Sequence, residues 1–169
     1  EILRTFDAKG SFFMLGNRVE VHPNLMQFIL AEGHCVGNHG YNHISGWRTN
    51  TRSYLENIEK ASALIASALF RPPYGRLRYT QYKRISSQYH IIMWDVLSGD
   101  YISQRTATQC LEHIVSQSRP GSIIVFHDTA RCMSILRQLL PAVLEYYQKQ
   151  DYQFLPLSEA VFGNNEKKL

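Results

Sequence analysis

The 169-residue sequence predicts an α/β fold with a parallel sheet. Short apolar runs typical of strands alternate with segments whose apolar residues recur at helical spacing. Two of the runs, 90–96 and 122–126, are apolar almost throughout, as in strands that helices bury on both faces. The pattern leaves an open doubly wound sheet and a (β/α) barrel as alternatives. Neither a G-x-G-x-x-G after the first strand nor a G-x-x-x-x-G-K-[ST] occurs, so nucleotide-binding versions lack their main support.

Each expected element follows from its local pattern. The strands are expected at 11–15, 34–37, 69–70, 90–96, 122–126 and 152–155. The helices are expected at 1–6, 23–33, 50–68, 79–88, 107–115 and 136–147, with a last turn from Ser158. Gly10 is expected to close the first helix, and Pro23 suits the first turn of a helix that Gly33 closes. Asn50 or Thr51 supplies the cap of the following helix.

The composition is that of a globular chain and excludes several classes of function. Apolar residues make up 44% and charged residues 19%, which suits a packed core rather than disorder. No apolar run approaches the roughly 20 residues of a transmembrane helix. The net charge is +4, but the basic residues are scattered along the sequence, so we expect no nucleic-acid partner. Cys35, Cys110 and Cys132 form no C-x-x-C pair and are expected to be small buried residues.

Polar side chains follow four of the expected strands at the point where each ends. They are Asn38, His39, Asn42 and His43, then Arg71 and Tyr74, then Asp95, Ser98 and Asp100, and finally His127 and Asp128. The carboxyl ends of parallel strands lie at one edge of a sheet, where α/β proteins build their sites. We therefore expect one polar site at that edge.

His39 and His43 are candidate metal ligands. On a helical turn, a spacing of four residues places both rings on one face. An isolated H-x-x-x-H is a weak signal, and two solvated histidines are the alternative. A catalytic zinc site has three protein ligands and an open position for water, and the third ligand is not supplied locally.

His127 is a candidate general acid, with Asp95 or Asp100 as the carboxylate that would orient it. The alternative is a hydrogen-bonded histidine at a strand end. Arg71 either forms a surface salt bridge or, on the rigid turn before Pro72-Pro73, orients a carboxylate in bidentate fashion. Such a turn also fixes backbone N–H groups that can face a developing oxyanion.

In this order and spacing, the segments resemble the polysaccharide deacetylase family, the NodB-homology domain of carbohydrate esterase family 4. The matching segments are Lys9 to Gly16, Glu32 to His43, Arg71-Pro72-Pro73-Tyr74-Gly75, Trp94 to Tyr101, and Val125-Phe126-His127-Asp128. We expect residues 1–162 to form the deacetylase domain and residues 163–169 to form a polar tail.

The resemblance implies a distorted, incomplete (β/α) barrel that hydrolyses N-acetyl groups of an aminosugar polymer, a peptidoglycan- or chitin-like glycan. It implies a divalent metal, usually zinc, held by two histidines and one aspartate. Carried over by position, His39 and His43 are the histidine ligands. The resemblance also favours a location outside the cytoplasm or at the cell envelope.

The resemblance also implies roles for the other site residues. His127 is the general acid, and Asp100 tunes it. Arg71 orients the catalytic carboxylate, and the backbone N–H of Tyr74 helps to bind the oxyanion. The residues implied in substrate binding are Tyr74, Trp94, Tyr101 and Val125.

The sequence departs from the family pattern at several positions. Gly40 replaces Ser or Thr, Tyr101 replaces Trp and Val125 replaces Leu, which would reshape the groove without removing the chemistry. The TFDDG motif, which carries the catalytic base and the third metal ligand, is absent. Thr5-Phe6-Asp7 imitates it, but Asp7 falls at a helix end and is not expected to be catalytic. Because residue 1 falls inside a helix, we expect the aspartate pair upstream and the 169 residues alone to be inactive or nearly so.

Three functions stay open: a metal-dependent deacetylase, a non-catalytic carbohydrate-binding relative of the same fold, and another metal hydrolase. The presence of His127 favours an enzyme, because a pure binding module needs no proton donor. We expect a monomer that acts on an N-acetylated glycan. The sequence leaves the glycan, the metal and the compartment undecided.

Overall fold

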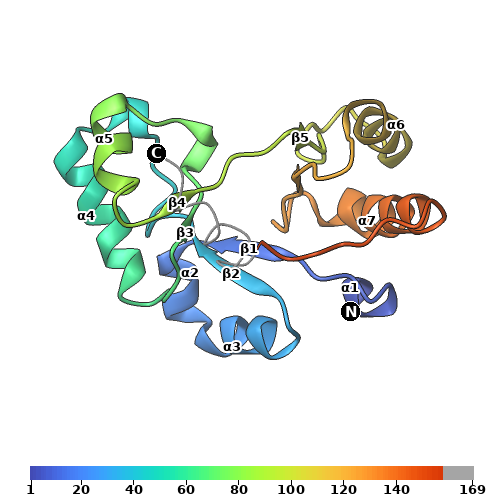
Figure 1. Ribbon diagram of the computed structural model, residues 1–169, viewed down its shortest axis with the longest axis horizontal. Helices are drawn as coiled ribbons and strands as arrows, with labels where there is room; N and C mark the ends of the chain where they lie inside the picture. Colours follow the sequence, from blue (N-terminus) through green and yellow to red (C-terminus); the bar gives the residue numbers. More distant parts are fainter. Residues whose placement is uncertain (158–169) are drawn as a thin grey trace, which may run out of the picture. The chain divides into compact units, whose positions relative to one another are not determined.

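A computed structural model describes residues 1–157, which fall into two compact units (Figure 1). The larger unit contains Lys9–Met93, with the described residues 155–157. The smaller unit contains Glu1–Ala8 and Trp94–Phe154. The expected final turn at Ser158 and the polar tail 163–169 lie outside the described residues. The prediction of one domain over residues 1–162 stays a prediction.

The larger unit is built on a four-stranded parallel sheet with the order β1-β2-β3-β4. Its strands are β1 (Ser11–Met14), β2 (Cys35–Asn38), β3 (Leu69–Phe70) and β4 (His90–Ile91). Its helices are α2 (Gly16–Val21), α3 (Pro23–Ala31), α4 (Thr51–Ser62) and α5 (Tyr79–Ile85), with 3₁₀ turns at Gly46–Arg48 and Pro73–Gly75. Helices therefore connect every pair of consecutive strands, as parallel pairing requires. The predicted α/β class with parallel strands is confirmed.

Local sequence accounts for most of these elements. The Asn50 side chain accepts a hydrogen bond from the backbone N–H of Ser53 at 2.9 Å, which caps α4 as predicted. Pro23 begins α3, and Gly33 follows it with a φ of 77°. The short helix α2 was not predicted, because Val19 is its only buried apolar side chain and gives no periodicity.

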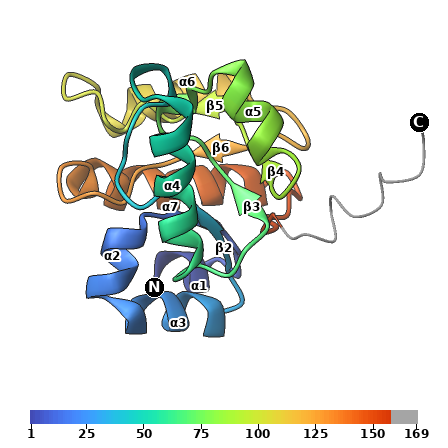
Figure 2. The ribbon, with the colours of Figure 1, turned by 90° about the vertical axis from the view of Figure 1, so that its left-hand side faces the viewer.

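Two apolar clusters form the core of the larger unit. One contains Val19, Ile29, Val36 and Ile65, and the other contains Tyr54, Ile58, Phe70 and Ile85. Helix α4 packs against β2 (Figure 2), and its buried residues are Tyr54, Ile58 and Ala61. The core therefore fixes the sheet edge at which β2 and β3 end.

The smaller unit contains α1 (Ile2–Thr5), β5 (Val96–Leu97), α6 (Ala107–Gln117), β6 (Ile124–Val125) and α7 (Met133–Gln148). Strand β5 pairs in parallel with β6, with Val96 opposite Ile124. Helix α6 packs on α7 around the buried residues Val96, Cys110, Ile114, Leu139, Val143 and Tyr147. Cys110 and Cys132 are buried, as predicted, whereas the same prediction is wrong for Cys35 of the larger unit, which is only partly buried.

The expected strand 90–96 is instead two short strands in different sheets, β4 and β5. Side chains form hydrogen bonds with backbone groups on both sides of the break between β4 and β5. The Arg71 guanidinium donates hydrogen bonds to the carbonyls of Ile92 and Met93, and the Asp95 carboxylate accepts one from the backbone N–H of Ile123. Apolar periodicity carries no information about such side-chain partners.

Two other expectations are wrong. No strand forms at 152–155, because Asp151 turns the chain with a φ of 61° and Tyr152 and Phe154 pack against the helical core. Helix α1 ends as predicted, but not at a glycine: Asp7 adopts a φ of 46°, and the N–H of Ala8 donates to the carbonyl of Leu3. No helix among residues 1–157 is long and apolar enough to cross a bilayer.

Candidate functional site

In the larger unit, His39 and His43 lie close together just after β2. Their ring centroids are 4.9 Å apart, and their Nε2 atoms are separated by 3.2 Å. Nδ1 of His39 lies 2.6 Å from the carbonyl oxygen of Arg71, which can only accept, so Nδ1 carries the proton. The lone pair of Nε2 then points toward His43. A histidine that donates its other ring N–H to a carbonyl is the usual arrangement of a metal ligand.

The geometry of the pair fits a single metal ion. Two imidazoles bound tetrahedrally at zinc–nitrogen distances of 2.0–2.1 Å have nitrogens about 3.3 Å apart. The separation of 3.2 Å matches this value, although it also permits a hydrogen bond between the rings. Residues 1–157 contain no group of three or more His, Cys, Asp or Glu side chains arranged to hold a metal. Among the described residues, His39 and His43 could therefore supply two of the ligands of a metal site.

The loop that carries the two histidines is anchored to its own unit by two asparagines. The buried Asn38 side chain accepts a hydrogen bond from the Gly40 N–H at 2.7 Å and donates to the Ile58 carbonyl at 3.2 Å. Asn57 on α4 accepts from the Tyr41 N–H at 3.0 Å. Sequence reasoning missed the role of Asn57, although an asparagine inside a helix was a possible signal, since it is a weak helix former.

Glycine at position 40 has a structural reason. Gly40 has a φ of 79°, and a Cβ built there would lie 2.8 Å from Oδ1 of Asn57. The left-handed conformation and the close approach both favour glycine. The anchoring of this loop by Asn57 therefore accounts for a glycine in place of Ser or Thr at this position.

Arg71 follows β3 and is buried, with 9% of its surface exposed. Nε donates to the carbonyl of Ile92 at 3.2 Å and Nη2 donates to that of Met93 at 3.3 Å. The guanidinium also lies 4.1 Å from the centroid of the Phe13 ring. Burial lowers the pKa of Arg71 to about 10, so the side chain stays charged at neutral pH. The surface salt bridge considered for this residue is therefore wrong.

Tyr74 lies on the rigid turn that the two prolines create. Its backbone is left-handed, with φ 60° and ψ 8°, a conformation that costs a non-glycine residue about 1–2 kcal/mol. Its side chain is exposed, and its ring meets that of His43 edge-on at 4.4 Å. Such strain is concentrated at functional sites. The larger unit therefore gathers His39, His43, Arg71 and Tyr74.

The smaller unit holds the second group. Asp100 is 2% exposed, and its two carboxylate oxygens bind His127 twice: Oδ2 accepts from the backbone N–H at 2.7 Å and Oδ1 from Nδ1 at 2.8 Å. Asp95, the other candidate, is 3.9 Å from Arg119 and accepts from Ile123. Of the two predicted partners, His127 therefore uses Asp100.

The arrangement defines the protonation geometry of His127. Nδ1 donates to the carboxylate, which fixes the tautomer and leaves Nε2 as the atom that can exchange a proton. The Tyr101 ring lies edge-on at 5.1 Å from the imidazole. Trp94 and Val125 are half-buried in the same unit, and Asp128 is exposed.

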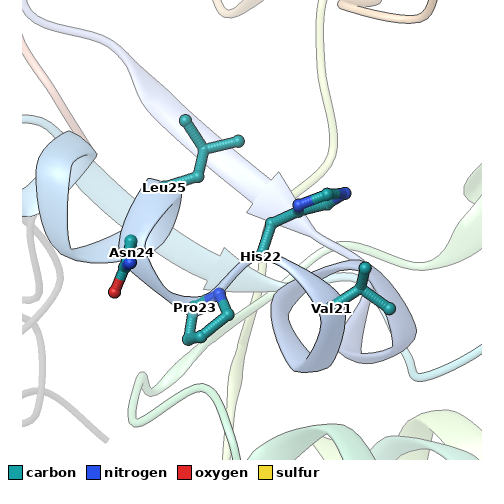
Figure 3. A pocket seen from close by; sticks show the side chains of 5 residues that line it. All are labelled: Val21, His22, Pro23, Asn24 and Leu25. Atoms are coloured by element: carbon teal, nitrogen blue, oxygen red, sulfur yellow. The ribbon is translucent and has the colours of Figure 1, made fainter.

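The structure also contains a pocket of about 360 Å³ between α2 and α3 (Figure 3). It is lined by Val21, His22, Pro23, Asn24 and Leu25. None of the predicted site residues lines it, so the pocket is separate from the candidate chemistry.

Comparison with known proteins places the chain in a family. Residues 1–91, more than half of the chain, match the sequence profile of polysaccharide deacetylases. The chain therefore belongs to the polysaccharide deacetylase family.

Several characterised relatives are similar over most of the chain. A peptidoglycan-N-acetylglucosamine deacetylase of Bacillus cereus is 33% identical over 136 residues, which cover 75% of this chain and 48% of the relative. The crystal structure of the Bc1960 peptidoglycan N-acetylglucosamine deacetylase superposes with a TM-score of 0.83 at 27% identity, covering 92% of this chain and 76% of the other. Peptidoglycan deacetylase PdaC of Bacillus subtilis gives a TM-score of 0.82 at 25% identity over 98% and 83% of the two chains. The chain spans about half the length of the first relative.

Proposed function

We propose that the protein is a metal-dependent hydrolase that removes N-acetyl groups from an aminosugar polymer, a peptidoglycan- or chitin-like glycan. The observation that carries the proposal is the His39–His43 pair, whose Nε2 atoms are 3.2 Å apart. The Arg71 carbonyl sets the tautomer of His39. Membership of the deacetylase family and the activities named for the relatives support the same reaction.

In this proposal His39 and His43 hold a divalent metal, zinc by preference, since imidazole suits zinc. Bound at this site, the metal would supply a nucleophilic water at neutral pH and polarise the acetyl carbonyl. The third ligand is an aspartate from outside residues 1–157, because the described residues bring none beside the pair. The catalytic base is proposed to come from outside the described residues as well.

His127 is the proton donor in the proposal. Asp100 holds Nδ1 at 2.8 Å, so the proton that moves to the departing amine comes from Nε2. The buried carboxylate stays in place during the transfer and keeps the ring oriented. The edge-on contact of Tyr101 with the imidazole supports a place for Tyr101 beside the acetyl group, together with Val125 and Trp94.

Arg71 and Tyr74 complete the assignment. The strained turn directs the Tyr74 N–H, which we propose faces the oxyanion that develops on the acetyl carbonyl. Arg71 supports this turn through two contacts: its carbonyl oxygen accepts from His39, and its guanidinium donates to the carbonyl of Ile92, after β4. We also assign it the orientation of the catalytic carboxylate.

Acetate release tests the proposal. The protein in its full natural length should release acetate from N-acetylated glycan fragments, lose this activity with a chelator, and regain it with Zn²⁺. His22→Ala, which changes an exposed histidine outside the assigned residues, serves as a matched control and should behave as the wild type. Glycan binding without acetate release by the full-length protein would instead support a non-catalytic carbohydrate-binding module.

A further inference from the structure

The loop between the two candidate metal ligands is hydrogen-bonded to helix α2. The backbone N–H of Gly16 donates to the carbonyl of Gly40 at 2.9 Å, and that of Asn17 donates to the carbonyl of Tyr41 at 3.2 Å. The Asn17 side chain donates to Oδ1 of Asn42 at 3.1 Å. Helix α2 therefore contacts all three residues that separate the histidines.

Helix α4, which packs beside α2 (Figure 2), holds the same loop through Asn57. Oδ1 of Asn57 accepts hydrogen bonds from the backbone N–H of Tyr41 at 3.0 Å and from that of Asn42 at 3.4 Å. The same oxygen would lie 2.8 Å from a Cβ at Gly40. The backbone carbonyl of Asn57 also accepts from the Tyr41 N–H, at 3.1 Å. One side chain of α4 thus lies against the whole loop.

The Tyr41 side chain adds a second, weaker set of contacts with the two helices. Its hydroxyl donates to the Glu20 carboxylate of α2, and the Lys60 ammonium of α4 lies 3.6 Å from its ring centroid. Glu20 and Lys60 are exposed, and interactions of exposed charged groups contribute little to stability. The hydrogen bonds of the loop backbone, rather than these surface contacts, therefore decide the conformation of the loop.

The conformation of the loop sets the distance between the two histidines. His39 is held independently, because its Nδ1 donates to the Arg71 carbonyl at 2.6 Å. His43 lies at the other end of the loop, so the 3.2 Å separation of the two Nε2 atoms depends on the path of the backbone between them. A site that has this spacing before a metal ion arrives needs little ordering on binding, which raises the affinity.

We propose that Asn57 is a positioning residue of the metal site. By accepting hydrogen bonds from Tyr41 and Asn42, it keeps His39 and His43 at the spacing that one metal ion requires. Side chains that orient metal ligands typically contribute about 10–100-fold to metal affinity. The inference rests on the proposed function, because it requires the metal site, and it adds a determinant of metal affinity that lies on a different element from either ligand.

Asn57→Ala in the full-length protein should weaken Zn²⁺ binding about tenfold or more, measured by competition with a chromophoric chelator. The fold should survive this substitution, because alanine is a better helix former than asparagine. Circular dichroism and urea unfolding of the same preparation check the fold. Asn57→Asp keeps an acceptor oxygen at the same position along the side chain and should retain most of the affinity. High salt in this measurement screens the added charge.

Asn50→Ala is the matched control on the same helix. Asn50 caps α4 by accepting from the Ser53 N–H at 2.9 Å, so its loss should destabilise the helix without removing a contact of the loop. The Zn²⁺ affinity of Asn50→Ala should stay at the wild-type value although its stability falls. Equal affinities of Asn57→Ala and the wild type, or equal losses of affinity in the two asparagine variants, would overturn the inference.

The behaviour of the wild type separates this inference from the proposed function. If the wild type binds Zn²⁺ and releases acetate while Asn57→Ala keeps the same affinity, only the positioning role is refuted. If the wild type binds Zn²⁺ without releasing acetate, the proposed reaction is refuted, and the affinity comparison still tests Asn57. If the wild type binds no Zn²⁺, the proposed function and the positioning role are both refuted.

Discussion

Asp100 binds His127 with both of its carboxylate oxygens, one at the backbone N–H and the other at Nδ1 of the ring. The same side chain therefore fixes the end of strand β6 and the tautomer of the histidine that follows it. Because the carboxylate is almost fully buried, water cannot replace either bond without opening the unit.

Asp100→Asn should reduce kcat of the full-length protein about 10²-fold or more, because an amide can present its NH₂ to Nδ1 and stabilise the wrong tautomer. Metal content should not change. Asp95→Asn is the control: Asp95 is exposed, and its contacts are with the Ile123 N–H and Arg119 rather than with His127, so kcat of this variant should stay near that of the wild type. Equal rates for the two variants would remove Asp100 from its assigned role.

His127→Ala should lower kcat about 10²–10⁴-fold, the usual contribution of a general acid. The metal should remain bound, since the two proposed ligands lie in the other unit. Kinetics together with metal analysis of the same preparation measure both effects. A nearly normal rate would show that another group donates the proton.

His39→Ala should abolish stoichiometric metal binding in the full-length protein. The substitution removes one proposed ligand and also breaks the contact with the Arg71 carbonyl. Elemental analysis after dialysis measures the outcome, with His22→Ala as the matched control. Retention of one metal per chain in the His39→Ala protein would exclude it as a ligand.

Arg71→Met should destabilise the protein by about 2–4 kcal/mol, because the buried carbonyl of Ile92 loses a charged donor. Arg71→Lys should lose less stability, since an ammonium can keep one of the two hydrogen bonds to the Ile92 and Met93 carbonyls. Urea unfolding measures the difference, and Arg18→Met is the surface control.

The pKa of Arg71, lowered to about 10 by burial, adds a pH dependence to this prediction. A cation whose folded pKa is depressed makes folding less favourable as pH falls from its higher unfolded pKa, and this contribution is constant once pH is below the folded pKa. The loss in Arg71→Met should therefore be the same at pH 6 and pH 8. A loss that changes between these values would contradict the assignment of a charged Arg71.

Gly40→Ala should destabilise the larger unit by about 1–3 kcal/mol, because the new side chain meets both a left-handed backbone and Oδ1 of Asn57. Gly121→Ala separates the two causes: its φ is 85°, but a Cβ there meets nothing within 4 Å. We expect Gly40→Ala to be the more harmful of the two in thermal unfolding. Equal losses would mean that the approach of Asn57 adds no energy.

The local pattern of the chain was sufficient to predict most of the elements and the residues that gather at the sheet edge. Apolar runs and helical spacing located β1, β2, β3, α3, α4, α6 and α7, since burial imposes these periods directly on the sequence. Order and spacing of the short motifs around His39, Arg71 and His127 were sufficient to predict the family, which the profile match confirms.

The hydrogen-bond and strand partners of these residues could not be predicted from the local pattern, because they depend on contacts between residues that are distant in the sequence. The division of the run 90–96 into β4 and β5 depends on the Arg71 guanidinium, which binds carbonyls 21 and 22 residues further along the chain. The choice of Asp100 over Asp95 depends on which carboxylate the β5–β6 pairing buries beside His127. Only the folded chain brings the Arg76 guanidinium to 4.9 Å from the Trp47 ring centroid, although the two residues are far apart in the sequence.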